Sequence, residues 1–339
     1  MKELLLYLIA PTFLVSFVVS FVLTKLGIPF LKRKRMGQMI LEIGPEWHKK
    51  KEGTPTMGGI FFLSAALLTF LIVALFVATA SSEGADLSWL CVLLFALANG
   101  AIGFVDDYVK FIKHQNKGLS ALQKLIFQFA FAALFLFGMH LCGALTTTLV
   151  LPFGLGVWDL GIFYYLFLIV FVVLFVNAVN LTDGLDGLAG SNVSVVLLFF
   201  VLFGLLGSSS LLFDASDAMR ILFSVCIFGG VLAFLCFNRY PAKIFMGDTG
   251  SLFLGAALSA LAVWSGFDLI LLLCGIVFLF EALSVVLQVG FFKLTGGKRL
   301  FKMAPFHHHL EKCSMSENAI VCLFCVVTTL GCVAAFFAF

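Results

Sequence analysis

The chain has 339 residues, of which 62% are apolar and only 12% are charged, and its formal net charge at pH 7 is +3. Soluble domains carry about a quarter charged residues, and a water-soluble core could not cover the 42 phenylalanines of this chain. The composition therefore excludes a soluble globular protein, gives no reason to expect a nucleic-acid partner, and favours a protein embedded in the lipid bilayer.

Apolar segments of membrane-spanning length recur along the whole chain. A spanning helix needs about 20 predominantly apolar residues, and ten segments approach this length. They are 4–26, 57–79, 88–105, 121–142, 160–179, 191–207, 219–237, 250–266, 269–290 and 319–338. The first is followed by "KRKR" rather than a small-residue cleavage site, which favours a first span over a signal peptide. We expect an all-α polytopic membrane protein with about ten transmembrane helices, forming one domain over 1–339.

The basic residues are distributed unequally between the two sets of connections. Eighteen of the 21 Lys and Arg residues lie in, or at the margin of, one set. This set comprises 31–56, 106–120, 180–190, 238–249 and 291–318. The internal loops of the other set carry only acidic charges. By the positive-inside rule, the first set faces the cytoplasm and both termini are extracytoplasmic.

The same cytoplasmic set carries five polar motifs. In chain order they read "KKKEGTPTMGG" (49–59), "VDDYVK" (105–110), "NLTDGLDGLAG" (180–190), "FNRYPAKIFMGDTGS" (237–251) and "APFHHHLEK" (304–312). Carboxylates, amides, imidazoles and lysines from distant segments would thus meet at one membrane face. Each motif also has a plain structural interpretation, so their combination is what suggests a site.

The aspartates of these motifs illustrate the alternatives. Asp106 and Asp107 end the third span, where negative charge opposes the helix macrodipole, which makes a purely structural role less favourable. Asp183 and Asp186 share a face if their segment is helical, although Asp183 could also be only a helix cap. Asp248 lies in a glycine-bounded turn before the eighth span.

Taken together, these residue types suit magnesium and phosphate chemistry. Mg²⁺ is usually bound by one or two carboxylates plus substrate phosphates, and lysines with glycine-lined backbone neutralise phosphate oxygens. The P-loop pattern is absent, which argues against a P-loop ATPase. A phosphate-bearing cytoplasmic substrate and an acceptor in the membrane would fit this face.

Glu281 stands apart, because it lies inside the ninth predicted span. An ionisable group at that depth is costly and is commonly functional, but it could also pair locally near a bent or broken helix.

In order, the five motifs resemble the signatures of the phospho-N-acetylmuramoyl-pentapeptide transferase family, which belongs to the superfamily of polyprenyl-phosphate sugar-1-phosphate transferases. The resemblance covers essentially the whole chain, and "TPTMGG" with "PFHHHLE" is similar to the muramoyl-pentapeptide branch. It implies a Mg²⁺-dependent transfer of phospho-MurNAc-pentapeptide from its UDP carrier to undecaprenyl phosphate, giving lipid I and UMP for peptidoglycan biosynthesis. It also implies a homodimer in the bacterial cytoplasmic membrane, with the active site facing the cytoplasm.

The resemblance also implies residue roles. The catalytic residues would be Asp106, Asp107, Asp248 and His307, with Asp248 and Asp107 as metal ligands. The substrate-binding residues would be Lys51, Thr56, Lys124, Asn180, Asp183, Gly184, Leu185, Asp186, Asn238, Phe245, Gln288, His308 and His309. Among these, Phe245 would stack on uracil.

Two other functions and two mechanisms stay open at this point. A sibling transferase would use UDP-GlcNAc, and a transporter would use Glu281 in a proton relay, although a transporter would not need five polar motifs on one face. The transfer could proceed by direct attack of the lipid phosphate, or through a covalent intermediate on an aspartate.

Overall fold

The computed structural model describes residues 2–34, 51, 53–80, 86–113, 118–207 and 214–339. Part of the predicted cytoplasmic connection 31–56 therefore lies outside the described residues. The helices of the first half are α1 (Lys2–Arg33), α2 (Gly59–Ala80), α3 (Ser88–Ile112), α4 (Ala121–Leu141), α5 (Ile162–Thr182) and α6 (Leu188–Gly207). Those of the second half are α7 (Ala215–Asn238), α8 (Gly247–Ser265), α9 (Ile270–Cys274), α10 (Ile276–Leu294), α11 (Phe306–Glu311) and α12 (Glu317–Ala338).

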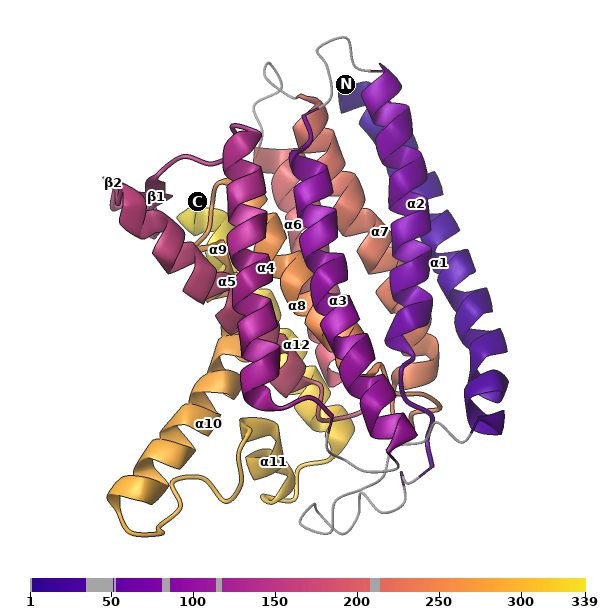
Figure 1. The fold of residues 1–339 in the computed structure, drawn as a ribbon, viewed down its shortest axis with the longest axis vertical. Coiled ribbons are helices and arrows are strands. Elements are labelled where there is room, and N and C mark those ends of the chain that lie inside the picture. The colour runs from indigo at the N-terminus through magenta and orange to yellow at the C-terminus, as the bar shows by residue number, and fades with distance from the viewer. Residues whose placement is uncertain (1, 35–50, 52, 81–85, 114–117, 208–213) are drawn as a thin grey trace.

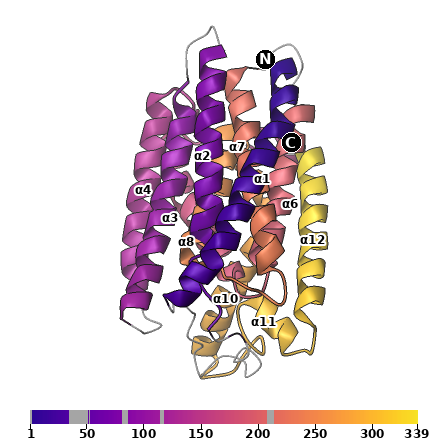
Figure 2. The same cartoon turned by 90° about the vertical axis from the view of Figure 1, so that its right-hand side faces the viewer.

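The helices form a bundle, with the start of α1 and the end of α12 toward the same end and α11 at the opposite end (Figures 1 and 2). Within the described part of the chain, nine helices are long and apolar enough to cross a membrane: α1 to α7, α10 and α12. The structure therefore confirms the prediction of an all-α, multi-pass membrane protein.

Helix α8, the eighth predicted span, occupies the interior of the bundle. All of its residues from Thr249 to Trp264 are buried, and it packs against α3 and α5, with α2 also in contact. Small residues permit this close approach. A Cβ atom added at Gly255 would lie 2.7 Å from the Cα of Val176 on α5, and one at Gly103 on α3 would collide with the Asp248 carbonyl. This tight packing holds the polar start of α8 against the end of α3.

The ninth predicted span, 269–290, is not one helix. It is divided at Gly275 into the short α9 and the longer α10, and the C-terminal half of α10 extends away from the other helices (Figure 1). Gly275 has φ −100° and ψ 16°, and a Cβ atom there would lie 2.6 Å from the Leu271 carbonyl oxygen and 2.8 Å from the Phe175 ring. Hydropathy concealed this break because the apolar sequence runs on from α9 into α10.

A small β-hairpin lies in the connection between α4 and α5, which the sequence did not indicate. Its strands β1 (Thr148–Val150) and β2 (Val157–Asp159) pair antiparallel, with Leu149 opposite Trp158. A one-turn 3-10 helix, η2 (Pro152–Gly154), lies between them.

Candidate active site

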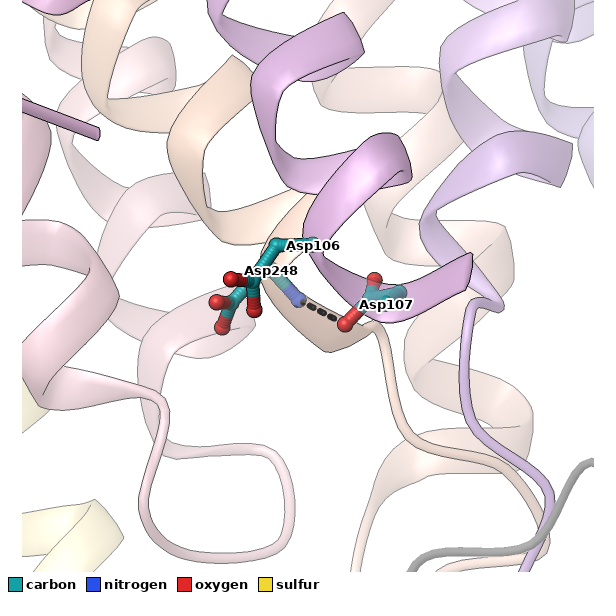
Figure 3. Close-up of side chains that lie close together, drawn as sticks. All are labelled: Asp106, Asp107 and Asp248. Atoms are coloured by element: carbon teal, nitrogen blue, oxygen red, sulfur yellow. Dashed lines mark hydrogen bonds between the residues drawn. The ribbon is translucent and has the colours of Figure 1, made fainter. Parts of the chain in front are cut away.

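Three aspartates meet where the end of α3 reaches the start of α8. Carboxylate oxygens of Asp106, Asp107 and Asp248 all lie within 4.8 Å of one another, and Figure 3 shows the three side chains together. The side chains of Asp106 and Asp107 are almost fully buried, at 1% and 4% exposure, whereas that of Asp248 is 19% exposed. Asp248 is therefore the carboxylate most open to an incoming ligand.

Asp107 is held by the first turn of α8. Its Oδ1 accepts a hydrogen bond from the Asp248 backbone N–H at 3.1 Å, and its Oδ2 accepts from the N–H and the hydroxyl of Thr249 at 2.9 and 2.7 Å. A carboxylate at a helix N-terminus also interacts favourably with the macrodipole. Asp107 thereby joins α3 to α8 through both of its carboxylate oxygens.

Two lysines lie between the carboxylates. Lys110 Nζ is 2.6 Å from Asp106 Oδ2 and 3.3 Å from Asp248 Oδ2. Lys124 Nζ is 2.9 Å from the same Asp248 oxygen and 3.4 Å from Asp106 Oδ1. Lys124 was predicted to bind substrate, whereas Lys110 was missed. Its place one turn after Asp106 was the available signal, because residues four apart share a helix face.

The last turn of α5 and the α5–α6 connection border this cluster. Asn180 donates one hydrogen bond to Asp248 Oδ1 at 3.0 Å and another to Ser251 Oγ at 2.8 Å. Asp183 follows at the C-cap of α5. Burial raises the pKa of Asp183 to about 8, and the carboxylates of Asp248 and Asp107 contribute to this rise. The neighbouring carboxylates therefore favour the protonated form of Asp183.

Further along this connection, Asp186 belongs to a second charged group. Lys51 Nζ lies 2.7 Å from Asp186 Oδ1 and 2.7 Å from Glu317 Oε2, at the start of α12. Burial alone would lower the pKa of Lys51, but the hydrogen bonds and charges of these two carboxylates raise it above its ordinary value. Asp186 also accepts the Ala242 N–H at 2.9 Å. Glu317, which the sequence reading missed, therefore helps to hold the predicted substrate-binding Lys51.

The α7–α8 connection is fastened to the "TPTMGG" segment. Asn238 is 2% exposed, accepts the Gly187 N–H at 3.2 Å and donates to the Ile244 carbonyl at 2.9 Å, so it braces two loops. The Phe245 N–H donates to the Pro55 carbonyl at 2.8 Å, and the Gly58 N–H donates to the Phe245 carbonyl at 2.9 Å. These bonds flank the predicted Thr56 and set Phe245, which is half-buried, beside it.

The histidine motif forms the short helix α11, and its three imidazoles have different environments. His307 is buried and lies 2.9 Å from Glu281. His308 lies 2.7 Å from Glu311. His309 Nδ1 accepts the Lys302 N–H at 3.1 Å. Of the three, His307 reaches the α5–α6 connection, because a Cβ atom at Gly184 would collide with its ring.

Two other predicted substrate residues have evident packing roles. Gln288 Oε1 accepts the N–H groups of Leu300 and Phe301 at 3.1 and 2.8 Å, which shapes the α10–α11 loop. Leu185 is buried in a small apolar cluster with residues of α10 and α12.

The comparisons with known proteins agree along the whole chain. The model of glycosyl transferase family 4 matches residues 89–266, and the phospho-N-acetylmuramoyl-pentapeptide-transferase signature 1 matches residues 51–63. The chain is similar to a phospho-N-acetylmuramoyl-pentapeptide-transferase of Listeria monocytogenes serotype 4b, with 43% identity over 328 residues, which is 97% of each chain. It is also similar to proteins of that name from Clostridium botulinum (41% identity, 99% of this chain and 98% of the relative) and Halalkalibacterium halodurans (41%, 96% of each).

These relatives match from end to end, and the signature falls on the very segment that Phe245 and its neighbours fasten to the aspartate cluster. The chain belongs to the phospho-N-acetylmuramoyl-pentapeptide-transferase family, a family of phospho-sugar transferases.

Proposed function

We propose that this protein transfers phospho-MurNAc-pentapeptide from its UDP carrier to undecaprenyl phosphate, forming undecaprenyl-diphospho-MurNAc-pentapeptide (lipid I) and UMP for peptidoglycan biosynthesis. The names of the relatives identify phospho-N-acetylmuramoyl-pentapeptide as the group that those proteins transfer. The observation that carries the proposal is the meeting of Asp106, Asp107 and Asp248 with two lysines at one end of the helix bundle. A diphosphate and a lipid phosphate both need such a charged site beside a bilayer.

The aspartate cluster suits Mg²⁺ as cofactor. Its donors are hard carboxylate oxygens, which Mg²⁺ prefers, and the three carboxylates exceed the charge of the two lysines by one. Asp248 and Asp107 would hold the ion, Asp248 through its more exposed oxygens. A bound Mg²⁺ supplies charge neutralisation for the diphosphate and the departing UMP.

The two lysines would bind phosphate oxygens. In the structure they are already within 3.3 Å and 2.9 Å of Asp248 Oδ2, so small side-chain movements would bring them to a substrate bound there. Their fixed positive charge would stabilise charge that develops on the transferred phosphoryl group. Asp183, beside the cluster at the end of α5, would contact the bound nucleotide sugar.

We propose direct attack by an oxygen of the lipid phosphate on the phosphorus bonded to the sugar. The new O–P bond forms as the bond to the UMP oxygen breaks. Asp106 would orient the lipid phosphate. A phosphate monoester has its second pKa near 6, so little base strength is required of Asp106.

The nucleotide would lie toward the loops on the other side of the cluster. Phe245 would stack on uracil. Lys51, Thr56, Asn180, Gly184, Asp186, His308 and His309 would contribute to the nucleotide-sugar pocket. Leu185, Asn238 and Gln288 would shape it from behind, as their buried or backbone-directed contacts suggest.

The proposed setting is the bacterial cytoplasmic membrane, with the site facing the cytoplasm, both termini outside and two copies forming a homodimer. The charge distribution of the loops supports this orientation.

The test is an Asp248→Ala variant, purified in detergent and supplied with undecaprenyl phosphate and UDP-MurNAc-pentapeptide. We expect Mg²⁺-dependent UMP release to fall at least about 100-fold, as expected on loss of an electrostatic transition-state group. Asp159→Ala, which removes an exposed carboxylate of the β2 strand, serves as control and should retain full activity. Normal turnover by Asp248→Ala, or UMP release by the unmodified protein with UDP-GlcNAc alone, would contradict the proposal.

A further inference from the structure

Glu281, a buried carboxylate on α10, is bonded to the first histidine of α11. Its Oε1 accepts the His307 backbone N–H at 3.0 Å, and its Oε2 lies 2.9 Å from Nδ1 of the same residue. Both side chains are almost fully buried, at 0% and 1% exposure. A charge buried in this way is costly unless it is paired. Packing alone would be served as well by an apolar residue.

With Glu281 ionised, the two contacts assign a proton to Nδ1 of His307. The backbone N–H can only donate, so Oε1 is an acceptor. An ionised carboxylate accepts at its second oxygen too, and Nδ1 must then carry a hydrogen. In the neutral ring, Nε2 is left with its lone pair.

Nε2 is the atom of this pair that remains available. It is buried and has no hydrogen-bond partner among the described residues. The ring is turned toward the α5–α6 connection, where a Cβ atom at Gly184 would collide with Nε2. Gly184 lies next to Asp183 and two residues before Asp186, so the unsatisfied nitrogen faces the loop proposed to line the nucleotide-sugar pocket.

We propose that Glu281 is a positioning residue for His307. It keeps the imidazole proton on Nδ1 and turns Nε2 toward the loop at Gly184, so that Nε2 is the one ring atom free to exchange a hydrogen bond or a proton with the substrate. A residue inside the membrane-spanning α10 thereby acts on the reaction through α11, without touching the substrate itself. The inference rests on the proposed function for the substrate, but the protonation of the ring does not depend on it.

The break at Gly275 sets where α10 begins. Because α10 begins anew at Ile276, Glu281 lies in its second turn and reaches α11 across the fold. The neighbouring Ser284 is equally buried, and its hydroxyl donates to the Glu281 carbonyl of its own helix at 2.7 Å. Ser284→Ala is therefore a matched control for a change at this depth of the same helix.

The first measurement is nitrogen NMR of histidine-labelled protein in detergent, with the His307 signal assigned by its loss in His307→Ala. Unmodified protein should show the Nδ1–H form. In Glu281→Gln the amide oxygen takes the backbone N–H and the amide NH₂ faces Nδ1, so the ring should change to the Nε2–H form. An identical signal in both proteins would overturn the proposal, whatever the substrate proves to be.

The second measurement is kinetic. Loss of a carboxylate that orients a reacting imidazole lowers kcat by orders of magnitude, so Glu281→Gln should lower kcat at least about 100-fold and change KM for the UDP substrate less than about threefold. Ser284→Ala should stay within about threefold of the unmodified protein in both.

A double variant tests whether Glu281 acts on the reaction through His307 or through the stability of the protein. In a His307→Ala background, Glu281→Gln should change the residual rate by less than about threefold, because residues that act as a unit are not additive. A further large loss would show that Glu281 acts independently of His307 and would overturn the proposal. If the unmodified protein released no UMP from UDP-MurNAc-pentapeptide, the proposed function would fail while the NMR result stood.

Discussion

At the scale of single residues, the aspartates of the site differ in their hydrogen bonds, their exposure and their neighbouring charges. Asp107 binds the start of α8 with both oxygens, while Asp248 keeps the greater exposure and faces both lysines. Asp183 has no such cationic neighbour among the groups that shift its pKa. The three carboxylates therefore differ: Asp107 braces α3 against α8, Asp248 faces the lysines, and Asp183 has a raised pKa.

The raised pKa of Asp183 predicts a pH dependence of stability in magnesium-free buffer. Between the ordinary value of 3.8 and the folded-state value of about 8, the folded protein holds a proton that the unfolded chain has released. This contribution to the free energy of unfolding therefore falls as pH rises through that range. Asp183→Asn removes it, so the variant should gain thermal stability relative to the unmodified protein as pH rises from about 5 to about 8.

Thermal unfolding in detergent measures this difference at each pH. Asp159→Asn is the control, because the hydrogen bonds from Thr147 and Gly161 lower the pKa of that exposed carboxyl below its ordinary value. Its stability difference should be flat over the same range. A flat difference for Asp183→Asn would show that this carboxyl is ionised in the folded protein.

Lys110 provides a second test at this scale. Lys110→Met removes a cation that lies within 3.3 Å of two aspartates, so kcat/KM should fall about 100-fold or more through loss of phosphate neutralisation. Lys113→Met, an exposed site three residues later, should leave kcat/KM unchanged. Equal activity of the two variants, measured as UMP release, would exclude Lys110 from the site.

At the scale of elements, the site depends on how closely α3 and α8 approach. The two helices touch at Gly103, where any side chain would collide with the Asp248 backbone. The same contact sets the distance over which Asp107 reaches Thr249. The helix pair and the site are thus one structural unit.

Gly103→Ala should therefore destabilise the protein and reduce activity together. Overpacking at such a contact costs roughly 1–3 kcal/mol, and the displaced Asp248 should lower kcat at least about tenfold. Gly290→Ala on α10 is the control, because a Cβ atom there meets nothing within 4 Å and alanine favours the helix. Thermal unfolding and UMP release measure both, and a stable, active Gly103→Ala would show that the helices can separate without loss.

At the scale of the whole molecule, the helices bring segments from most of the chain to one end of the bundle. The ends of α3 and α5, the start of α8, and α11 all lie there, opposite the start of α1 and the end of α12 (Figures 1 and 2). If the termini are extracytoplasmic, this end faces the cytoplasm.

Cys313 allows a direct test of that orientation, because it is exposed and directly follows α11. A membrane-impermeant thiol reagent should label Cys313 in inside-out vesicles and leave it unlabelled in intact cells. Cys313→Ser identifies the signal among the nine cysteines. Labelling from outside intact cells would place the site on the extracytoplasmic face and contradict the proposed use of a cytoplasmic nucleotide substrate.

The sequence predicted where the membrane-spanning helices lie better than it predicted how they break and pack. The segments of nine apolar helices were predicted from hydropathy, since each requires only a local run of apolar residues. The motifs likewise identified Asp106, Asp107 and Asp248 before their proximity was known. The break at Gly275 was missed, because a glycine inside an apolar run looks the same whether the helix continues or ends there.

The sequence by itself determined that this is a multi-pass membrane protein of a particular transferase family, because composition, hydropathy and motifs are properties of consecutive residues. Only the tertiary structure decided the partners: Lys110 with Asp248, Lys51 with Glu317, and Glu281 with His307. These pairs join positions far apart in the chain, and whether they meet depends on the rotation and close packing of whole helices. The sequence marked Glu281 as an ionisable group inside an apolar segment, but only the fold shows which group lies beside it.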